Sequence, residues 1–178
     1  MKSKKLIIFI PSIEGGGVEK NLYLLSNYSA KKFRKIYILT AHKNVKKKFD
    51  KRIILITPKS NKWSKSSRFV KSFVCFFLFL RLNKKFVLVS FQSNIMAIIL
   101  AKIFSHKVII RSNTSPSKYI SNFLKKILFK IFFKFADQIV VNSNEFKKIF
   151  YQFFNIHANV IYNILEKKKL NVKKKIHS

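Results

Sequence analysis

Three consecutive glycines, Gly15, Gly16 and Gly17, stand out because the chain of 178 residues contains no other glycine. They lie in the segment IPSIEGGGVEKN (10–21), between an apolar run typical of a buried strand and a segment with helical periodicity. Glycines at such a junction let the backbone turn sharply and approach a ligand closely. A helix that begins beside them directs its N–H groups and its positive dipole end toward an anion. Because a tight turn alone needs one glycine, we predict a phosphate cradle, with a simple turn as the alternative.

The common phosphate-binding fingerprints do not fit this run. The dinucleotide fingerprint G-x-G-x-x-G needs a third glycine where the chain has Lys20, and no G-x-x-x-x-G-K-[ST] spacing occurs. NAD, FAD and ATP hydrolysis therefore lose support. No D-x-D pair is present, and the four histidines lack the spacing of metal ligands, so we expect no metal and no cofactor.

The glycines must be positioned by alternating strands and helices. Continuous apolar runs predict seven strands, at 5–11, 35–41, 52–58, 85–92, 107–113, 138–143 and 159–165. Helical periodicity between them predicts helices at 18–33, 66–82, 94–104, 116–135 and 144–154, with Ser115 as the N-cap and Pro116 in the first turn of the fourth. This alternation predicts an α/β fold: a Rossmann-like, doubly wound parallel sheet with helices on both faces.

Five segments in this order resemble one known family: LIIFIPSIEGGGVEKNLYLLSNY, VLVSFQSN, VIIRSNTSP, ADQIVVNSNEFKKIF and NVIYNIL. The chain is similar to the amino-terminal domain of a family 4 glycosyltransferase, a retaining enzyme of the GT-B fold that uses a nucleotide-sugar. The resemblance covers about residues 5 to 165. It implies a glycosyltransferase domain at 1–165, one half of a GT-B fold, followed by a basic tail at 166–178 that we expect to be disordered.

The resemblance also implies a set of site residues on the cleft side of the sheet. Gly15, Gly16 and Gly17 would lie near the donor diphosphate. The acceptor side of the cleft would be lined by residues at or just after the ends of the fourth, fifth and sixth strands: Ser90, Gln92, Ser93, Asn94, Arg111, Asn113, Ser143 and Glu145. No catalytic residue can be assigned.

Several of these residues also have a purely structural interpretation. Ser143 has the residue type and position of a helix N-cap, and Glu145 would favour the dipole of the same helix. Arg111 could pair with a carboxylate of the fold instead of a ligand. Glu14 and Glu19, which flank the glycines, are expected at the surface.

The second half of a GT-B enzyme, with its pair of glutamates separated by seven residues, is not part of the sequence. The resemblance therefore implies a truncated chain, or one chain of a split enzyme with a separate donor-binding partner. Its function would be transfer of a sugar from a nucleotide-sugar co-substrate to a glycan or a lipid-linked acceptor, as in polysaccharide biosynthesis. We expect no secretory signal and no transmembrane segment, and so a cytoplasmic protein.

The formal net charge of +32, from 38 basic and six acidic residues, favours anionic partners. A coding bias toward Lys, Ile, Phe and Asn is an equal explanation. The basic, amphipathic segment 116–135 could lie on an anionic membrane at the inner face, or be a core helix with a solvated lysine face. Alternatives to the transferase are thus a non-catalytic basic module that binds membrane or nucleic acid, and an inactive remnant. The sequence contains no nucleic-acid recognition motif, so binding of nucleic acid is not favoured.

Overall fold

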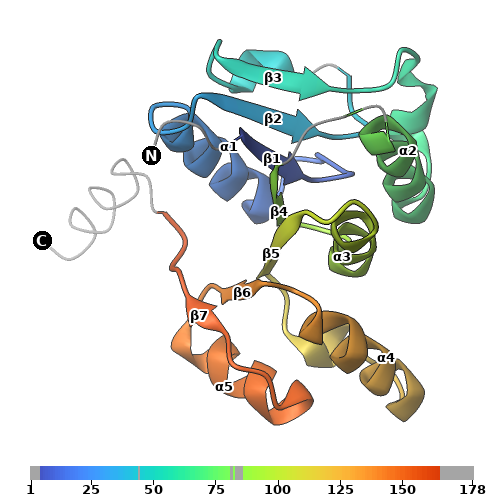
Figure 1. Cartoon of the computed structure of the whole chain (residues 1–178), viewed down its shortest axis with the longest axis vertical. Coiled ribbons are helices and arrows are strands. Elements are labelled where there is room, and N and C mark those ends of the chain that lie inside the picture. Colours follow the sequence, from blue (N-terminus) through green and yellow to red (C-terminus); the bar gives the residue numbers. More distant parts are fainter. Residues whose placement is uncertain (1–4, 44, 81, 83–85, 165–178) are drawn as a thin grey trace, which may run out of the picture.

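The computed structural model describes residues 5–164, except 44, 81 and 83–85, and Figure 1 traces their course. Seven strands in this part of the chain form one sheet with the order β3-β2-β1-β4-β5-β6-β7, and every adjacent pair is parallel. The strands are β1 (Lys5–Phe9), β2 (Lys35–Leu39), β3 (Ile53–Ile56), β4 (Val87–Ser90), β5 (Lys107–Ser112), β6 (Gln138–Val141) and β7 (Asn159–Val160). The predicted fold class is confirmed.

Helices lie on both faces of the sheet. They are α1 (Gly17–Ser29), α2 (Arg68–Leu80), α3 (Asn94–Ile103), α4 (Phe123–Lys134) and α5 (Asn144–Phe154). Three 3₁₀ turns accompany them: η1 (Lys46–Lys48), η2 (Asn61–Lys65) and η3 (Pro116–Lys118). On β1, Ile8 packs in one core cluster with Leu22 of α1, whereas Ile7 packs in the other with Cys75 of α2. Alternate side chains of a strand point to opposite faces, so α1 and α2 cover opposite sides.

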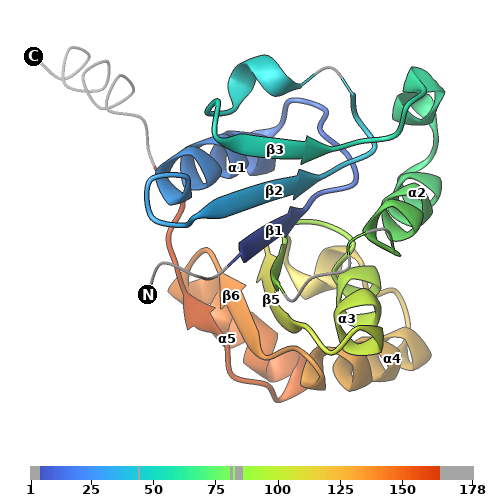
Figure 2. The ribbon, with the colours of Figure 1, turned by 45° about the horizontal axis from the view of Figure 1, so that its top comes forward.

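The order of the strands reverses between β1 and β4. The chain runs outward from β1 through β2 to β3, then crosses back to β4 and continues outward through β7 (Figure 2). Helices α1 and α3 both begin beside this reversal, at the carboxyl ends of β1 and β4. In open α/β sheets ligands bind outside the carboxyl ends of the strands at such a switch point.

The structure contradicts one predicted helix. The segment 116–135 is not a single helix: η3 ends at Lys118, and α4 begins at Phe123. Ser115 makes no capping hydrogen bond, and Asn122 caps α4 instead, accepting from the Lys125 N–H at 2.8 Å. The extended backbone of Asn122 interrupts the helix, because an N-cap residue has non-helical dihedrals.

The other predicted elements are confirmed in kind and order, most of them with shorter bounds. Helix α5 matches its predicted range, whereas β7 ends at Val160, five residues before the predicted end. The predicted basic tail at 166–178 lies outside the described residues. Among the helices that the structure describes, none has the length and apolar character needed to cross a bilayer.

Candidate functional site

The glycine run forms an exposed loop between β1 and the first turn of α1. Gly15 has a φ of +97°, in the region that side chains with a Cβ rarely adopt. A Cβ on Gly16 would lie 3.0 Å from Oε2 of Glu19, whereas a Cβ on Gly17 would meet nothing within 4 Å. Two of the three glycines therefore serve the loop itself. The third leaves open space at the start of the helix.

The N-terminus of α1 has no side-chain cap. Gly16 occupies its N-cap position and offers no acceptor, whereas α4 and α5 are capped by Asn122 and Ser143. The first N–H groups of a helix need a partner, which can be a side chain, water or a ligand. An uncapped helix that starts beside an exposed glycine loop suits an anion.

Glu19 corrects the expectation of a surface carboxylate. It is buried in the first turn of α1, and its Oε1 accepts from the N–H of Glu14 at 3.4 Å. The negative charge in the first turn favours the helix dipole. Glu19 thus joins the first turn of α1 to the backbone just before the glycines.

Alanine substitutions separate the two kinds of glycine. We expect Gly15→Ala to lower the free energy of unfolding by about 1–2 kcal/mol, because its positive φ penalises a Cβ. Gly17→Ala should instead raise it by up to about 1 kcal/mol, because alanine favours a helix and the space is open. Urea unfolding of both variants and the unaltered chain measures the difference. Equal losses for the two would contradict the loop geometry.

Hydrogen bonds join the segment before the glycines to the loop after β4, and join that loop in turn to Asn113 after β5. The N–H of Ser12 donates to Oε1 of Gln92 at 3.2 Å, across the switch point. Asn113 Nδ2 donates to the carbonyl of Phe91 at 3.3 Å. The structure therefore brings the predicted residues Gln92 and Asn113 to the same edge of the sheet as the glycines.

The remaining predicted residues near the end of β4 make hydrogen bonds around the start of α3. Ser90 Oγ lies 2.8 Å from both the Gln92 carbonyl and Oδ1 of Asn94. Ser93 has a φ of 53° and places its Oγ 2.7 Å from the Oγ of Ser72 on α2. With its side chain used there, Ser93 leaves α3 without a side-chain cap. Two uncapped helix starts, those of α1 and α3, therefore flank the switch point.

Arg111 is buried at the end of β5. Its Nε donates to Oδ1 of Asn113 at 3.1 Å, and its Nη2 donates to the Ile161 carbonyl and to Oδ1 of Asn163 at 3.1 and 2.9 Å. Burial lowers the pKa of its guanidinium. Each of these acceptors is a neutral oxygen, so the alternative of pairing with a carboxylate of the fold is absent from these contacts. Arg111 joins β5 to the segment after β7, and its contact with a ligand stays a prediction.

Ser143 and Glu145 lie at the start of α5. Ser143 Oγ accepts from the N–H of Phe146 at 3.1 Å, which confirms the N-cap interpretation. Glu145 is exposed in the first turn of the same helix. The hydrogen bonds that join the glycine loop to the loops after β4 and β5 do not include either residue. Their place in a ligand cleft stays a prediction.

A buried lysine beside the loop was not among the predicted site residues. Lys71 of α2 donates from Nζ to Oε1 of Glu14 at 2.9 Å and to Oγ of Ser12 at 3.0 Å. The Lys71 side chain is 5% exposed and that of Glu14 is 57% exposed, so the ion pair has one buried and one solvated end. Ser12 Oγ also donates to Glu14. The hydrogen bond from Ser12, followed by the contact with Lys71, lowers the pKa of Glu14 to about 2.

His42, after β2, is the second residue that the sequence did not single out. Its Nε2 is buried and has no hydrogen-bond partner in the part of the chain that the structure describes. Burial lowers the pKa of His42, the charge of Lys71 adds to this, and Glu14 opposes it. An imidazole shifted in this direction is mainly neutral at pH 7 and can donate or accept one hydrogen bond.

The spacing on α2 gave a signal that could have revealed Lys71. Lys71, Cys75 and Phe79 are four residues apart and all buried on one helix face. A lysine at the head of a buried stripe is costly unless it is paired. His42 carries no comparable signal, because only the tertiary fold brings it beside Lys71.

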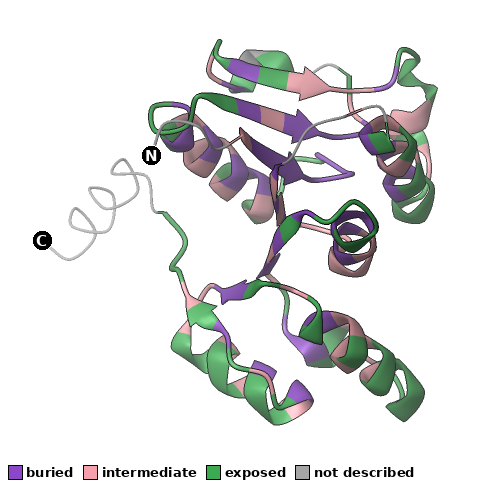
Figure 3. Cartoon of the chain, in the orientation of Figure 1, coloured by how far each residue is buried: buried purple, intermediate pink, exposed green. Residues whose placement is uncertain are grey.

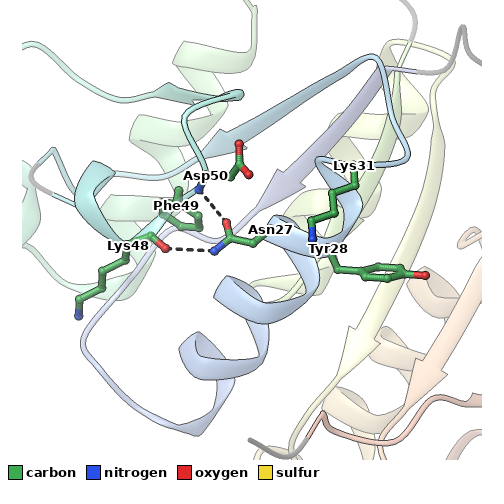
Figure 4. Close-up of a pocket in the computed structure, with 6 residues that line it drawn as sticks. All are labelled: Asn27, Tyr28, Lys31, Lys48, Phe49 and Asp50. Atoms are coloured by element: carbon green, nitrogen blue, oxygen red, sulfur yellow. Dashed lines mark hydrogen bonds between the residues drawn. The ribbon is translucent and has the colours of Figure 1, made fainter.

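A pocket of about 450 Å³ lies elsewhere, between the end of α1 and the segment before β3 (Figure 4). Asn27 spans it, donating to the Lys48 carbonyl at 3.3 Å and accepting from the Asp50 N–H at 2.8 Å. The Asp50 carboxylate is bound by Arg52 at 2.8 and 2.9 Å. This pocket is at the amino edge of the sheet, opposite the glycine loop, and includes none of the predicted site residues.

Comparisons with known proteins give a likeness in structure alone. No protein-family model and no curated protein matches the sequence. Among solved structures, HepE of Anabaena in complex with UDP aligns with a TM-score of 0.60 and 13% identity over 98% of this chain. HepE in complex with UDP-glucose aligns with a TM-score of 0.64 and 11% identity over 97% of this chain.

A third match is the structure of a UGT transferase from Siraitia grosvenorii in complex with UDP, with a TM-score of 0.50 and 9% identity over 97% of this chain. This chain spans about half the length of these structures, 50% for HepE and 55% for the transferase. At such low identity the matches establish the fold. The chain has the fold of one α/β unit of a GT-B glycosyltransferase.

Proposed function

We propose that the chain is the amino-terminal, acceptor-side half of a retaining family 4 glycosyltransferase. It would transfer a sugar from a nucleotide-sugar to a glycan or a lipid-linked acceptor, with a donor-binding half supplied by further sequence or a separate chain. One observation carries the proposal: the exposed glycine loop leads into an uncapped helix at the switch point of the sheet. The structural neighbours solved with UDP and UDP-glucose support it.

The proposed role of the loop is to hold the donor diphosphate. The first N–H groups of α1 and its positive dipole end would stabilise the phosphate charge that grows as the nucleotide leaves. The open space at Gly17 would let a phosphate approach the backbone. Gln92, which is hydrogen-bonded to Ser12, and Asn113, which is hydrogen-bonded to Phe91, would border the sugar and the acceptor. No metal is part of the proposal.

Thermal unfolding of the full chain with added ligands tests the proposal. UDP and UDP-glucose should raise the Tm by an amount that grows with ligand concentration, because both would bind only the folded state. Uridine, which has no phosphate, is the matched control and should leave the Tm unchanged. Equal shifts for uridine and UDP, or none for either, would contradict a diphosphate site.

A second arm tests catalysis. Sugar transfer should require a donor-binding half in the same reaction and should continue after EDTA is added.

A further inference from the structure

Helix α4 exposes a continuous apolar stripe on the side that faces away from the sheet. Six large side chains, each 40–76% exposed, form this stripe: Phe123, Leu124, Ile127, Leu128, Ile131 and Phe135. Most of them follow one another at intervals of four residues, so they line one side of the helix. Phe133 points the other way and is buried in the core. The alternative that these apolar residues form the core face of the helix is therefore wrong.

Lysines border the α4 stripe. Lys125 and Lys134 are exposed, Lys126 and Lys130 are half-buried, and no acidic residue occurs between Phe123 and Phe135. The Nζ of Lys126 lies 5.3 Å from the centre of the Phe153 ring on α5. Asp137, the first acid after the helix, accepts from Lys102 at 3.0 Å. The α4 stripe therefore combines exposed apolar side chains with a local charge that is only positive.

Helix α2, on the same face of the sheet, also exposes apolar side chains. Its exposed Phe69, Phe73 and Phe77 are four residues apart, and the helix contains no acidic residue. Figure 1 places α2 and α4 on either side of α3. Figure 3 shows that much of the outer side of α4 is exposed. Both helices start at the carboxyl edge of the sheet, where the glycine loop lies.

We propose that the α4 stripe, assisted by α2, docks the chain on an anionic membrane surface. A helix with an apolar side and flanking lysines lies in the interface, burying the apolar side among the lipids and leaving the ammonium groups at the headgroups. Acidic lipids supply the opposite charge that α2 and α4 lack. A second copy of the chain fits less well, because two-fold pairing of the stripes would bring two rows of lysines together.

Sedimentation of the full chain with lipid vesicles tests this proposal. Vesicles with 30% phosphatidylglycerol should bind the chain, and neutral phosphatidylcholine vesicles should bind it at least tenfold more weakly. Leu124→Gln with Leu128→Gln should weaken binding to the acidic vesicles at least tenfold. Both side chains are exposed, so the circular dichroism spectrum should not change.

A charge-matched pair of variants separates a local surface from diffuse attraction. Lys125→Gln with Lys134→Gln should weaken binding about tenfold, whereas Lys31→Gln with Lys32→Gln, exposed at the end of α1, should change it less than twofold. Equal losses in the two pairs would overturn the proposal. So would retained binding after the leucine changes, or dimerisation through α4 without vesicle binding. The UDP-induced Tm shift should persist in all three double variants, so failure of one proposal can be distinguished from failure of the other.

Discussion

Gly17→Asp should leave the fold intact and weaken UDP binding at least a hundredfold. A Cβ at this position meets nothing within 4 Å, and an acidic side chain in the first helical turn favours the dipole. The free energy of unfolding should therefore stay equal or rise slightly. The same carboxylate would lie where the donor diphosphate is proposed to bind. Two like charges about 5 Å apart at an effective dielectric constant of 20 cost about 3 kcal/mol, which is more than a hundredfold in affinity.

The opposite signs of these two effects make the prediction specific. Isothermal titration of UDP measures the affinity, and urea unfolding measures the stability. Gly17→Ala is the matched control, because it adds the Cβ without the charge and should lose far less affinity. If the variant binds UDP as tightly as the unaltered chain does, the diphosphate does not bind at the N-terminus of α1, even if the chain is a transferase. A variant that unfolds would contradict the open space at Gly17.

The fold could be predicted from the sequence because its strands are continuous apolar runs. Most residues of Lys5–Phe9 and Lys107–Ser112 are buried in the sheet. Strands covered by helices are apolar along their length, so these two can be recognised from the local sequence alone. The order of the runs predicted the crossover architecture. The course of 116–135 could not be predicted, because Ser115-Pro116 and Asn122 both satisfy the rules for a helix start.

The candidate site was predictable only in part. The glycine loop could be predicted from the sequence, because each of its features belongs to adjacent residues. The contact of Ser12 with Gln92 joins residues 80 positions apart, and that of Lys71 with Glu14 joins residues 57 apart. Such contacts depend on how β1, β4 and α2 pack, which periodicity alone does not specify.

Glu14→Ala should destabilise the protein by about 2 kcal/mol, whereas Lys71→Met should cost well under 1 kcal/mol. Removing one partner of an ion pair is costly when the other charge stays buried. Lys71 is the buried end and Glu14 the solvated end. Losing Glu14 therefore leaves an unpaired ammonium group in the interior, while losing Lys71 leaves a carboxylate that water can solvate. Methionine also keeps much of the length and volume of the lysine stem.

The double variant and the pH dependence check this asymmetry. Glu14→Ala combined with Lys71→Met should regain most of the stability lost in Glu14→Ala, because no buried charge remains unpaired. The pKa of Glu14 lies below its usual 4.5, at about 2, so its stabilisation is present above pH 4.5 and is lost as the pH falls toward 2. Urea unfolding between pH 6 and 2.5 should show a smaller acid loss in Lys71→Met than in the unaltered chain. Equal costs of the two single changes would mean that the ion pair is solvated at both ends.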